Sequence, residues 1–179
     1  LKTGPLVITI HDAIHLLYPQ YLPNALAHGY AKAFFRNAAR AEHILTVSEW
    51  SKRDLCRLLG VPENKISVTH LAADPLFRTL PGSSWKADHE KYFRINRPYV
   101  LFVGNFKPHK NVAGLIRVFH RLNLAKTHSL VLVGRGWDRD TDLGRMLRDF
   151  SLEPCVRVLE NTPPAHLNLL YNGADLFVF

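Results

Sequence analysis

The sequence predicts an α/β protein made of two consecutive units, each a parallel sheet covered by helices. Two observations lead to this fold class. Short apolar or β-branched runs alternate with longer segments of helical periodicity, and the connections between them are short. The alternation is interrupted once, at residues 74–98, by a stretch rich in proline, glycine and serine, and then starts again.

The first unit is predicted to contain three strands and two helices. Asn24 and Ser48 have side chains that can cap a helix, and the helices that they begin are expected to reach about Arg40 and Leu59. Gly60 ends the second helix. The strands are expected at residues 6–10, 43–47 and 66–70, with the first of them buried.

The second unit is predicted to contain four strands and three helices. Asn111 can cap an amphipathic helix, a second helix is expected at residues 141–150, and a third begins at paired prolines and ends before Gly173. The strands are expected at residues 99–103, 129–133, 156–159 and 175–179. A helix between successive strands is the crossover that parallel pairing requires.

Composition places the chain among folded globular proteins, with 47% hydrophobic and 21% charged residues. No apolar run approaches the roughly 20 residues of a membrane-spanning helix. Cys56 and Cys155 are too few for a disulfide framework or a metal site, and we expect buried thiols. The only methionine is Met146 and the chain stops inside an apolar run, so we expect an internal piece of a longer protein.

The formal net charge of +8 is unevenly distributed. Residues 91–137 contain nine lysines and arginines and no acidic residue. A block of one sign attracts anions, and nucleic acid, acidic lipid and nucleotide phosphate are all candidates. Solvated helix faces and a basic linker are the alternative explanation for part of these charges.

The segment 104–111, Gly-Asn-Phe-Lys-Pro-His-Lys-Asn, connects a buried strand to an amphipathic helix. Open α/β sheets bind ligands at the carboxyl ends of their strands, and a helix N-terminus offers free N–H groups to phosphate. Lys110 adds an ammonium there, and Gly104 lets the backbone approach a ligand closely. The segment is a candidate anion site, with a turn whose lysines are merely solvated as the alternative.

Weaker indications come from residues that follow other strands. The imidazole of His11 could contact a sugar hydroxyl or move a proton, and Asp12 could fix its tautomer. Ser48 could hydrogen-bond a ligand, although capping a helix is the alternative, and Gly134 opens a second glycine-containing loop. The sequence contains no dinucleotide fingerprint, no P-loop and no hydrolase elbow, and the surroundings of His15 argue against a metal pair with His11.

Taken in order, these segments resemble the GT-B glycosyltransferases of family 4, also called group 1. The resemblance covers nearly the whole chain. It includes a strand ending in His-Asp, an Ala-Glu segment leading to Val-Ser-Glu-Trp-Ser, and the Gly-Asn loop with its lysine. The matching segments lie at residues 7–12, 41–51, 65–74, 99–111, 130–136 and 170–178.

The resemblance implies two Rossmann-like parallel-sheet domains, the GT-B fold, each incomplete in this chain. Residues 1–80 would form the C-terminal part of an N-terminal, acceptor-side domain. Residues 81–98 would be a linker, and residues 99–179 would begin the C-terminal, nucleotide-sugar-binding domain. Early strands would precede Leu1 and a donor-binding pair of glutamates would follow Phe179, so the fragment alone is expected to be inactive.

The resemblance also implies a retaining transferase that moves a hexose, such as mannose or glucose, from a nucleotide-diphosphate sugar to a saccharide or lipid-linked acceptor. Lys110 would be catalytic by stabilising charge on the departing diphosphate, with Gly104 and Asn105 as further phosphate ligands. His11 would be catalytic at the reaction centre. Other substrate contacts are expected from Asp12, Ser48 and Gly134. No metal ion or other cofactor is expected.

The chain departs from the family pattern in several places. Asn105 stands where many members carry arginine, and His109 replaces the arginine of the usual Pro-Arg-Lys. Residues 70–74 read His-Leu-Ala-Ala-Asp in place of the common His-Asn-Gly-Val-Asp. These departures leave open how many cations hold the diphosphate.

The alternative function is a non-catalytic nucleic-acid-binding or other anion-binding α/β module that uses residues 91–137. This block lacks a recognised binding motif and includes buried strands, so no nucleic-acid partner is expected. We expect a cytoplasmic protein, with peripheral association with the inner face of the membrane as an option. That option comes from basic and aromatic residues in one helix, whose alternative role is simply to pack on the sheet: Lys32, Phe34, Phe35, Arg36 and Arg40.

Overall fold

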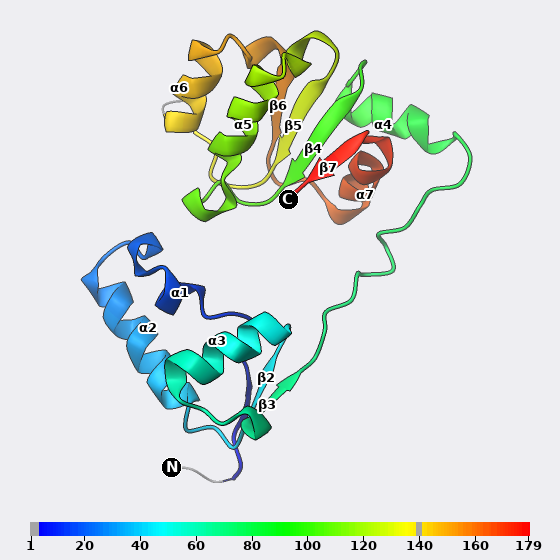
Figure 1. The fold of residues 1–179 in the computed structure, drawn as a ribbon. Helices are drawn as coiled ribbons and strands as arrows, with labels where there is room; N and C mark the ends of the chain where they lie inside the picture. The colour runs from blue at the N-terminus through cyan, green and yellow to red at the C-terminus, as the bar shows by residue number, and fades with distance from the viewer. Residues whose placement is uncertain (1–3, 139–140) are drawn as a thin grey trace. The chain divides into compact units, whose positions relative to one another are not determined.

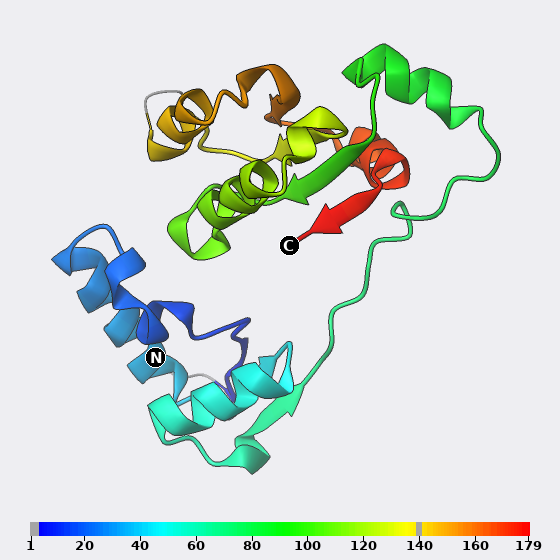
Figure 2. The same cartoon turned by 45° about the horizontal axis from the view of Figure 1, so that its top comes forward.

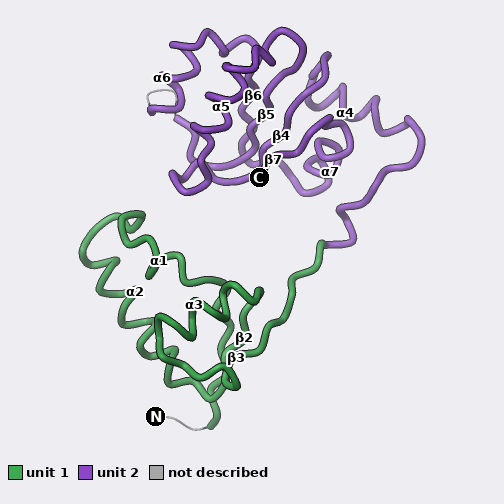
Figure 3. The backbone as a smooth tube through the Cα atoms, viewed as in Figure 1, with its two compact units in different colours: residues 1–73 green, residues 74–179 purple. Residues whose placement is uncertain are grey.

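The computed structural model describes residues 4–138 and 141–179, and the chain divides into two compact units, Leu1–Ala73 and Asp74–Phe179 (Figures 1 and 3). Each unit contains one parallel sheet with helices packed on it. The predicted α/β class with two parallel sheets is therefore confirmed.

The first unit has a three-stranded sheet in the order β1-β2-β3. Its elements are β1 (Val7–Thr9), α1 (Ile14–Leu17), α2 (Ala25–Ala38), β2 (His43–Thr46), α3 (Glu49–Leu59) and β3 (Ile66–Val68), with 3₁₀ turns at Pro19–Tyr21 and Glu63–Lys65. Ile44 pairs with Ile8 on one side and with Ile66 on the other. Ile44 and Leu55 of α3 are fully buried at the centre of this core.

Strand β1 differs from the buried strand expected at residues 6–10. Leu6 and Val7 are 47% and 54% exposed, and Ile10, just after the strand, is the residue of this run that lies in the core. Within the described sheet β1 pairs with β2 alone. The predicted burial is wrong for the start of the run. An apolar sequence indicates that a strand can be buried, but it does not indicate how many of its sides are covered.

The second unit has a four-stranded parallel sheet in the order β6-β5-β4-β7. Its strands are β4 (Tyr99–Val103), β5 (Ser129–Val133), β6 (Val156–Leu159) and β7 (Leu176–Val178), and its helices are α4 (Trp85–Phe93), α5 (Val112–Arg121), α6 (Asp142–Asp149) and α7 (Pro164–Gly173). Short 3₁₀ turns lie at Pro108–Lys110, Leu124–Lys126 and Glu153–Cys155. Helices cover both faces of this sheet (Figure 2).

Alternate residues of β4 point into two separate cores, as the pleat of a strand requires. Phe102 packs with Ile116 of α5, whereas Leu101 packs with Leu170 of α7. Both cores are fully closed at these positions, since all four side chains are at most 2% exposed. The strand that precedes the candidate anion site is thus held from both faces.

The predicted helix caps are confirmed. Asn24, Ser48 and Asn111 each accept the backbone N–H of the residue three positions later, at 2.9, 3.1 and 3.2 Å. Gly60 ends α3 in a left-handed conformation with a φ of 65°, which glycine adopts without steric cost.

Residues 81–98, expected to be a linker, contain helix α4. His89 and Phe93, one turn apart, are buried, and α4 packs against α7. Only one of these two residues is apolar, so the segment lacks the spacing that predicts a helix. The structure places this helix within the second unit, which begins at Asp74.

The extended chain before α4 is fastened to α7 by side-chain amides. Asn168 accepts the N–H of Arg78 at 3.2 Å. Asn172 accepts the N–H of Leu80 at 2.8 Å and donates to the carbonyl oxygen of Arg78 at 3.0 Å. These bonds attach residues 78–80 to the second unit.

Candidate functional site

The loop after β4, residues 104–111, is fixed at both ends by hydrogen bonds. The N–H of Gly104 donates to the carbonyl oxygen of Val133 at 2.8 Å, which extends the β4–β5 ladder. Asn111 ends the 3₁₀ turn Pro108–Lys110 with a left-handed φ of 51° and caps α5. The loop is therefore separate from the helix, and the first N–H groups of α5 open next to it.

Lys110 lies at the carboxyl edge of the second sheet, where the strand order reverses. Its Nζ is 4.1 Å from the ring centroid of Phe179, the residue that follows β7. Strand β4 has β5 on one side and β7 on the other. Open α/β sheets bind ligands at such a switch point. The ammonium of Lys110 therefore lies where this fold class receives an anionic ligand.

Gly134 is required by a close approach of two loops. A Cβ on Gly134 would lie 1.8 Å from the carbonyl oxygen of Gly104 and 3.5 Å from the Cα of Asn105. Its N–H donates to the carbonyl oxygen of Leu159 at 3.0 Å. The glycine loop after β5 and the loop after β4 thus pack backbone to backbone. Contact of Gly134 or of the exposed Asn105 with a substrate stays a prediction.

Glu160 also lies at this edge, and the sequence patterns did not identify it. It follows β6, and its Oε1 accepts the N–H groups of Gly136 at 3.1 Å and Trp137 at 3.3 Å. The indole of Trp137 packs edge-on against the ring of Phe106, with centroids 5.7 Å apart. The sequence held one indication of a site role for Glu160: it directly follows a strand, and residues that follow parallel strands lie at the same edge of the sheet.

In the first unit the predicted residues lie at the carboxyl ends of β1 and β2. Ser51 Oγ donates to the carbonyl oxygen of His11 at 3.0 Å, and Ser48 Oγ donates to Ser51 Oγ at 3.0 Å. The structure therefore connects His11 and Ser48 through Ser51, which ends the matching segment 41–51 but was not among the predicted site residues. Ser48 caps α3 as well, so the alternative interpretation of this residue is confirmed.

Asp12 has a different partner from the one expected. Its Oδ1 accepts the N–H of Ile14 at 3.0 Å, so the carboxylate stabilises the start of α1. His11 and Asp12 both line a largely apolar cavity of about 430 Å³ within the first unit. The remaining lining is mostly from α2 and includes Ala27, Tyr30, Ala31, Phe34 and Phe35. An apolar cavity with a few polar groups at one end is typical of a small-molecule site.

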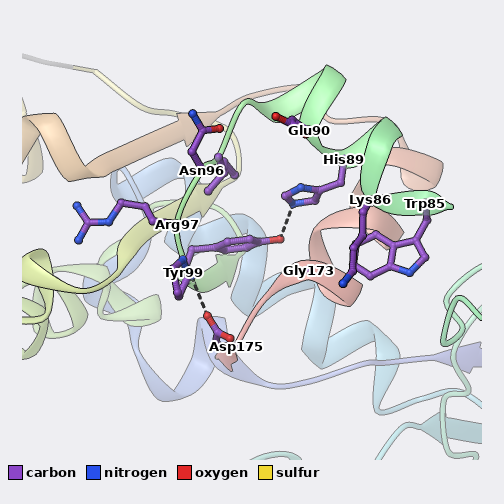
Figure 4. Close-up of a pocket in the computed structure, with 11 residues that line it drawn as sticks. Trp85, Lys86, His89, Glu90, Asn96, Arg97, Tyr99, Gly173 and Asp175 are labelled. Atoms are coloured by element: carbon purple, nitrogen blue, oxygen red, sulfur yellow. Dashed lines mark hydrogen bonds between the residues drawn. The ribbon is translucent and has the colours of Figure 1, made fainter. Parts of the chain in front are cut away.

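A cavity of about 520 Å³ lies at the opposite, amino-terminal end of the second sheet (Figure 4). The Tyr99 hydroxyl donates to the carbonyl oxygen of Leu170 at 2.7 Å and lies 2.9 Å from Nε2 of His89, so Nε2 is the donor in the second bond. Asp175 accepts the Tyr99 N–H at 3.0 Å. These polar groups join α4, β4 and α7, so we assign them a structural role.

Burial alters the acid–base behaviour of this pair. It lowers the pKa of His89, because the charged imidazolium would lose hydration. It raises the pKa of Tyr99, and the charge of Asp175 raises that pKa further. Both side chains are therefore neutral near neutral pH, as their hydrogen bonds require.

Neither cysteine is in a disulfide; Cys155 is buried and Cys56 is partly buried. Burial raises the pKa of Cys155, so this thiol stays protonated. Among the residues that the structure describes, no group of three histidine, cysteine, aspartate or glutamate side chains could hold a metal ion.

Comparison with protein families gives two matches. The model described as glycosyl transferases group 1 matches residues 84–179, and the model described as glycosyltransferase family 4 matches residues 1–75. Together they span both units of the structure.

Two curated relatives match almost the whole chain. The O-antigen chain mannosyltransferase B of Escherichia coli is 29% identical over 176 residues, which are 97% of this chain and 46% of that protein. The O-antigen chain mannosyltransferase RfbU of Salmonella typhimurium is 27% identical over 179 residues, and the match covers 96% of this chain and 44% of that protein. The chain spans about half the length of the curated relatives it matches.

Solved structures share the fold. WaaG, a glycosyltransferase involved in lipopolysaccharide biosynthesis, superimposes with a TM-score of 0.78 at 13% identity, over 97% of this chain and 50% of that chain. Anabaena HepE in complex with UDP-glucose gives a TM-score of 0.72 at 22% identity, over 97% of this chain and 46% of that chain. The fold class implied by the sequence resemblance is therefore confirmed.

Proposed function

The chain belongs to the glycosyl transferases of group 1, and from this premise we propose that it is part of an enzyme that transfers a hexose from a nucleotide-diphosphate sugar to a saccharide or lipid-linked acceptor. The observation that carries the proposal is the position of Lys110 at the switch point of the second sheet. An ammonium beside the N-terminus of α5 is suited to a diphosphate.

Lys110 acts in this proposal on the leaving group. As the bond from the anomeric carbon to the diphosphate breaks, negative charge builds on the phosphate oxygens, and the ammonium and the first amides of α5 stabilise it. Gly104 and Asn105 are proposed as further phosphate ligands, and Gly134 packs against their backbone. These fixed positive groups are proposed to take the place of a metal ion, and transfer is proposed to retain the anomeric configuration.

The names of the relatives support particular substrates. Both curated relatives are mannosyltransferases of the O-antigen chain, so mannose is the hexose that we propose first, with a polysaccharide as the product. The HepE complex with UDP-glucose supports a nucleotide-diphosphate sugar as the donor class and glucose as the second choice.

The cavity of the first unit is proposed to receive sugar groups. His11 and Asp12 line this cavity, and the Ser48 hydroxyl is linked to the His11 backbone through Ser51. We assign His11 to the reaction centre, and Asp12 and Ser48 to substrate contacts.

Cytoplasmic location with peripheral attachment to the inner face of the membrane is also proposed. Helix α2 exposes Lys32, Arg36 and Phe34, whereas Phe35 is buried in the core and takes no part. Basic residues next to an exposed aromatic ring suit an anionic lipid surface. No helix within residues 4–138 or 141–179 has the length and apolar character to cross a bilayer. Co-sedimentation of the intact protein with anionic but not neutral vesicles would support the attachment.

Nucleic-acid binding has weaker support. The basic block at residues 91–137 includes the buried strands β4 and β5, so its charges are divided among separate elements. One of these basic residues, Arg97, donates to the carbonyl oxygen of Ala125 at 2.8 Å, so its role is structural.

The test is Lys110→Ala in the intact protein, with Lys126→Ala as the control because Lys126 is an exposed lysine of the same unit. We expect Lys110→Ala to weaken GDP or UDP binding by about 1.5–3 kcal/mol, the range for hydrogen bonds to charged groups. We expect Lys126→Ala to bind like the wild type. Equal nucleotide affinity of Lys110→Ala and the wild type would contradict the assigned role.

A further inference from the structure

A single carboxylate oxygen holds the turn of the glycine loop that follows β5. Glu160 Oε1 accepts two successive N–H groups, from Gly136 at 3.1 Å and from Trp137 at 3.3 Å. Gly136 has a φ of 87°, a left-handed conformation that lets successive amides point to one side and form an anion-binding turn. The anion in this turn is a side chain from the neighbouring strand's loop, 23 and 24 residues further along the chain.

The same glycine loop supports the loop that carries the proposed phosphate ligands. The carbonyl oxygen of Arg135 accepts the N–H of Phe106 at 3.5 Å, and the ring of Phe106 meets the indole of Trp137. Gly134 lies so close to Gly104 that there is no room for a β-carbon between them. A shift of the glycine loop would therefore reach the backbone of residues 104–106.

We propose that Glu160 is a positioning residue for the donor: through Gly136 and Trp137 it keeps the loop after β4 in the shape that binds the diphosphate. This inference rests on the proposed function. Glu160 does not need to touch the donor, and two N–H groups balance its negative charge next to a site for an anion. Because both N–H groups already donate to the carboxylate, the proposed ligands of the diphosphate are Lys110 and the first N–H groups of α5.

The experiment compares Glu160→Ala, Glu160→Gln and the control Glu90→Ala, an exposed glutamate on α4, in the intact protein. GDP and UDP affinity and the donor KM and kcat are measured for each. We expect Glu160→Ala to raise the donor KM about tenfold, which corresponds to about 1.4 kcal/mol, with kcat changed much less. Glu160→Gln keeps an oxygen that accepts both N–H groups, so its KM should stay close to that of the wild type.

Hydrogen exchange gives a second measurement that needs no donor. Glu160→Ala should speed amide exchange in a peptide covering residues 134–138 and leave β5 unchanged, whereas Glu160→Gln should resemble the wild type. Faster exchange with an unaltered donor KM would overturn the inference, because the glycine loop would then not control the site. Equal impairment of the Gln and Ala variants would overturn it too. If the wild type binds neither GDP nor UDP, the proposed function fails, and the exchange result still decides whether Glu160 holds the loop.

Discussion

His89 and Tyr99 form a buried hydrogen bond of 2.9 Å that joins helix α4 to the first residue of strand β4. The Tyr99 hydroxyl in turn donates a hydrogen bond to the carbonyl oxygen of Leu170 in α7. Two hydrogen bonds thus tie together three elements at the amino-terminal end of the second sheet, and Figure 4 shows the first of them, between His89 and Tyr99. Helix α4, which the sequence patterns did not predict, is attached by this polar contact, by the packing of Phe93 and by Arg157, which donates to the carbonyl oxygen of Phe93 at 2.9 Å.

The buried imidazole should make stability depend on pH. The pKa of His89 is lower in the folded protein than its ordinary value of 6.5, so the unfolded chain takes up a proton first as the pH falls. Stability should therefore decrease as the pH drops below 6.5 and level off once folded His89 is protonated too. His89→Gln keeps an N–H donor but cannot titrate, and urea unfolding between about pH 8 and pH 5 should show a smaller decrease. The same decrease in His89→Gln would contradict this assignment; His70→Gln, at an exposed site, is the control.

Gly134→Ala should damage the carboxyl edge of the second sheet. The added Cβ would lie 1.8 Å from the Gly104 carbonyl oxygen, so one of the two loops must move. We expect a loss of about 1–3 kcal/mol in the free energy of unfolding, the range for overpacked sites, together with weaker nucleotide binding. The control is Gly29→Ala in α2, where a Cβ meets nothing within 4 Å and alanine favours the helix. If Gly134→Ala matched the wild type in both measurements, the close approach of the loops would be wrong.

Thr46→Val should leave stability unchanged or raise it. Thr46 is fully buried, and within the described part of the chain its hydroxyl has no hydrogen-bond partner. Replacing this hydroxyl by a methyl group removes an unsatisfied polar atom, so urea unfolding should show a gain of up to about 1 kcal/mol. Thr69→Val should have the opposite sign, since the Thr69 hydroxyl donates to the Thr46 carbonyl oxygen at 3.3 Å. A clear loss in Thr46→Val would show that the hydroxyl has a partner.

Ser51→Ala should lower transfer activity with little effect on folding. The Ser51 hydroxyl holds the backbone of His11 and receives the hydroxyl proton of Ser48. Losing the bond to the His11 backbone should reduce kcat/KM about fivefold, which corresponds to about 1 kcal/mol, the typical net value of one hydrogen bond. Steady-state kinetics of the intact protein is the measurement, and Ser83→Ala, an exposed serine, is the control. Unchanged kinetics in Ser51→Ala would mean that the His11 backbone needs no support from this hydroxyl.

Much of the fold could be predicted because each element has a local pattern. The apolar runs at residues 99–103 and 129–133 coincide with β4 and β5, and the polar caps Asn24, Ser48 and Asn111 begin helices as expected. Helix α4 was missed because its two buried positions are a histidine and a phenylalanine. Its stability comes from tertiary packing, which a local pattern does not contain.

The candidate site could be predicted only in part. Gly104 and Lys110 were identifiable because a loop between a strand and a helix N-terminus has a recognisable sequence. The neighbours of that loop depend on the strand order β6-β5-β4-β7, which brings Gly134 and Glu160 to the same edge. Local patterns do not encode that order. The substrate roles of His11, Asp12 and Ser48 stay predictions, although the structure shows how Ser51 links two of them.

Strand β5 has a neighbouring strand on each side, and all five of its residues, Ser129–Val133, are buried. Its amides should be among the last in the second unit to exchange with solvent, because only global opening exposes them. Exchange at β5 is therefore an internal reference. A substitution at the carboxyl edge that leaves it unchanged has reshaped a binding surface, whereas one that accelerates it has loosened the whole unit.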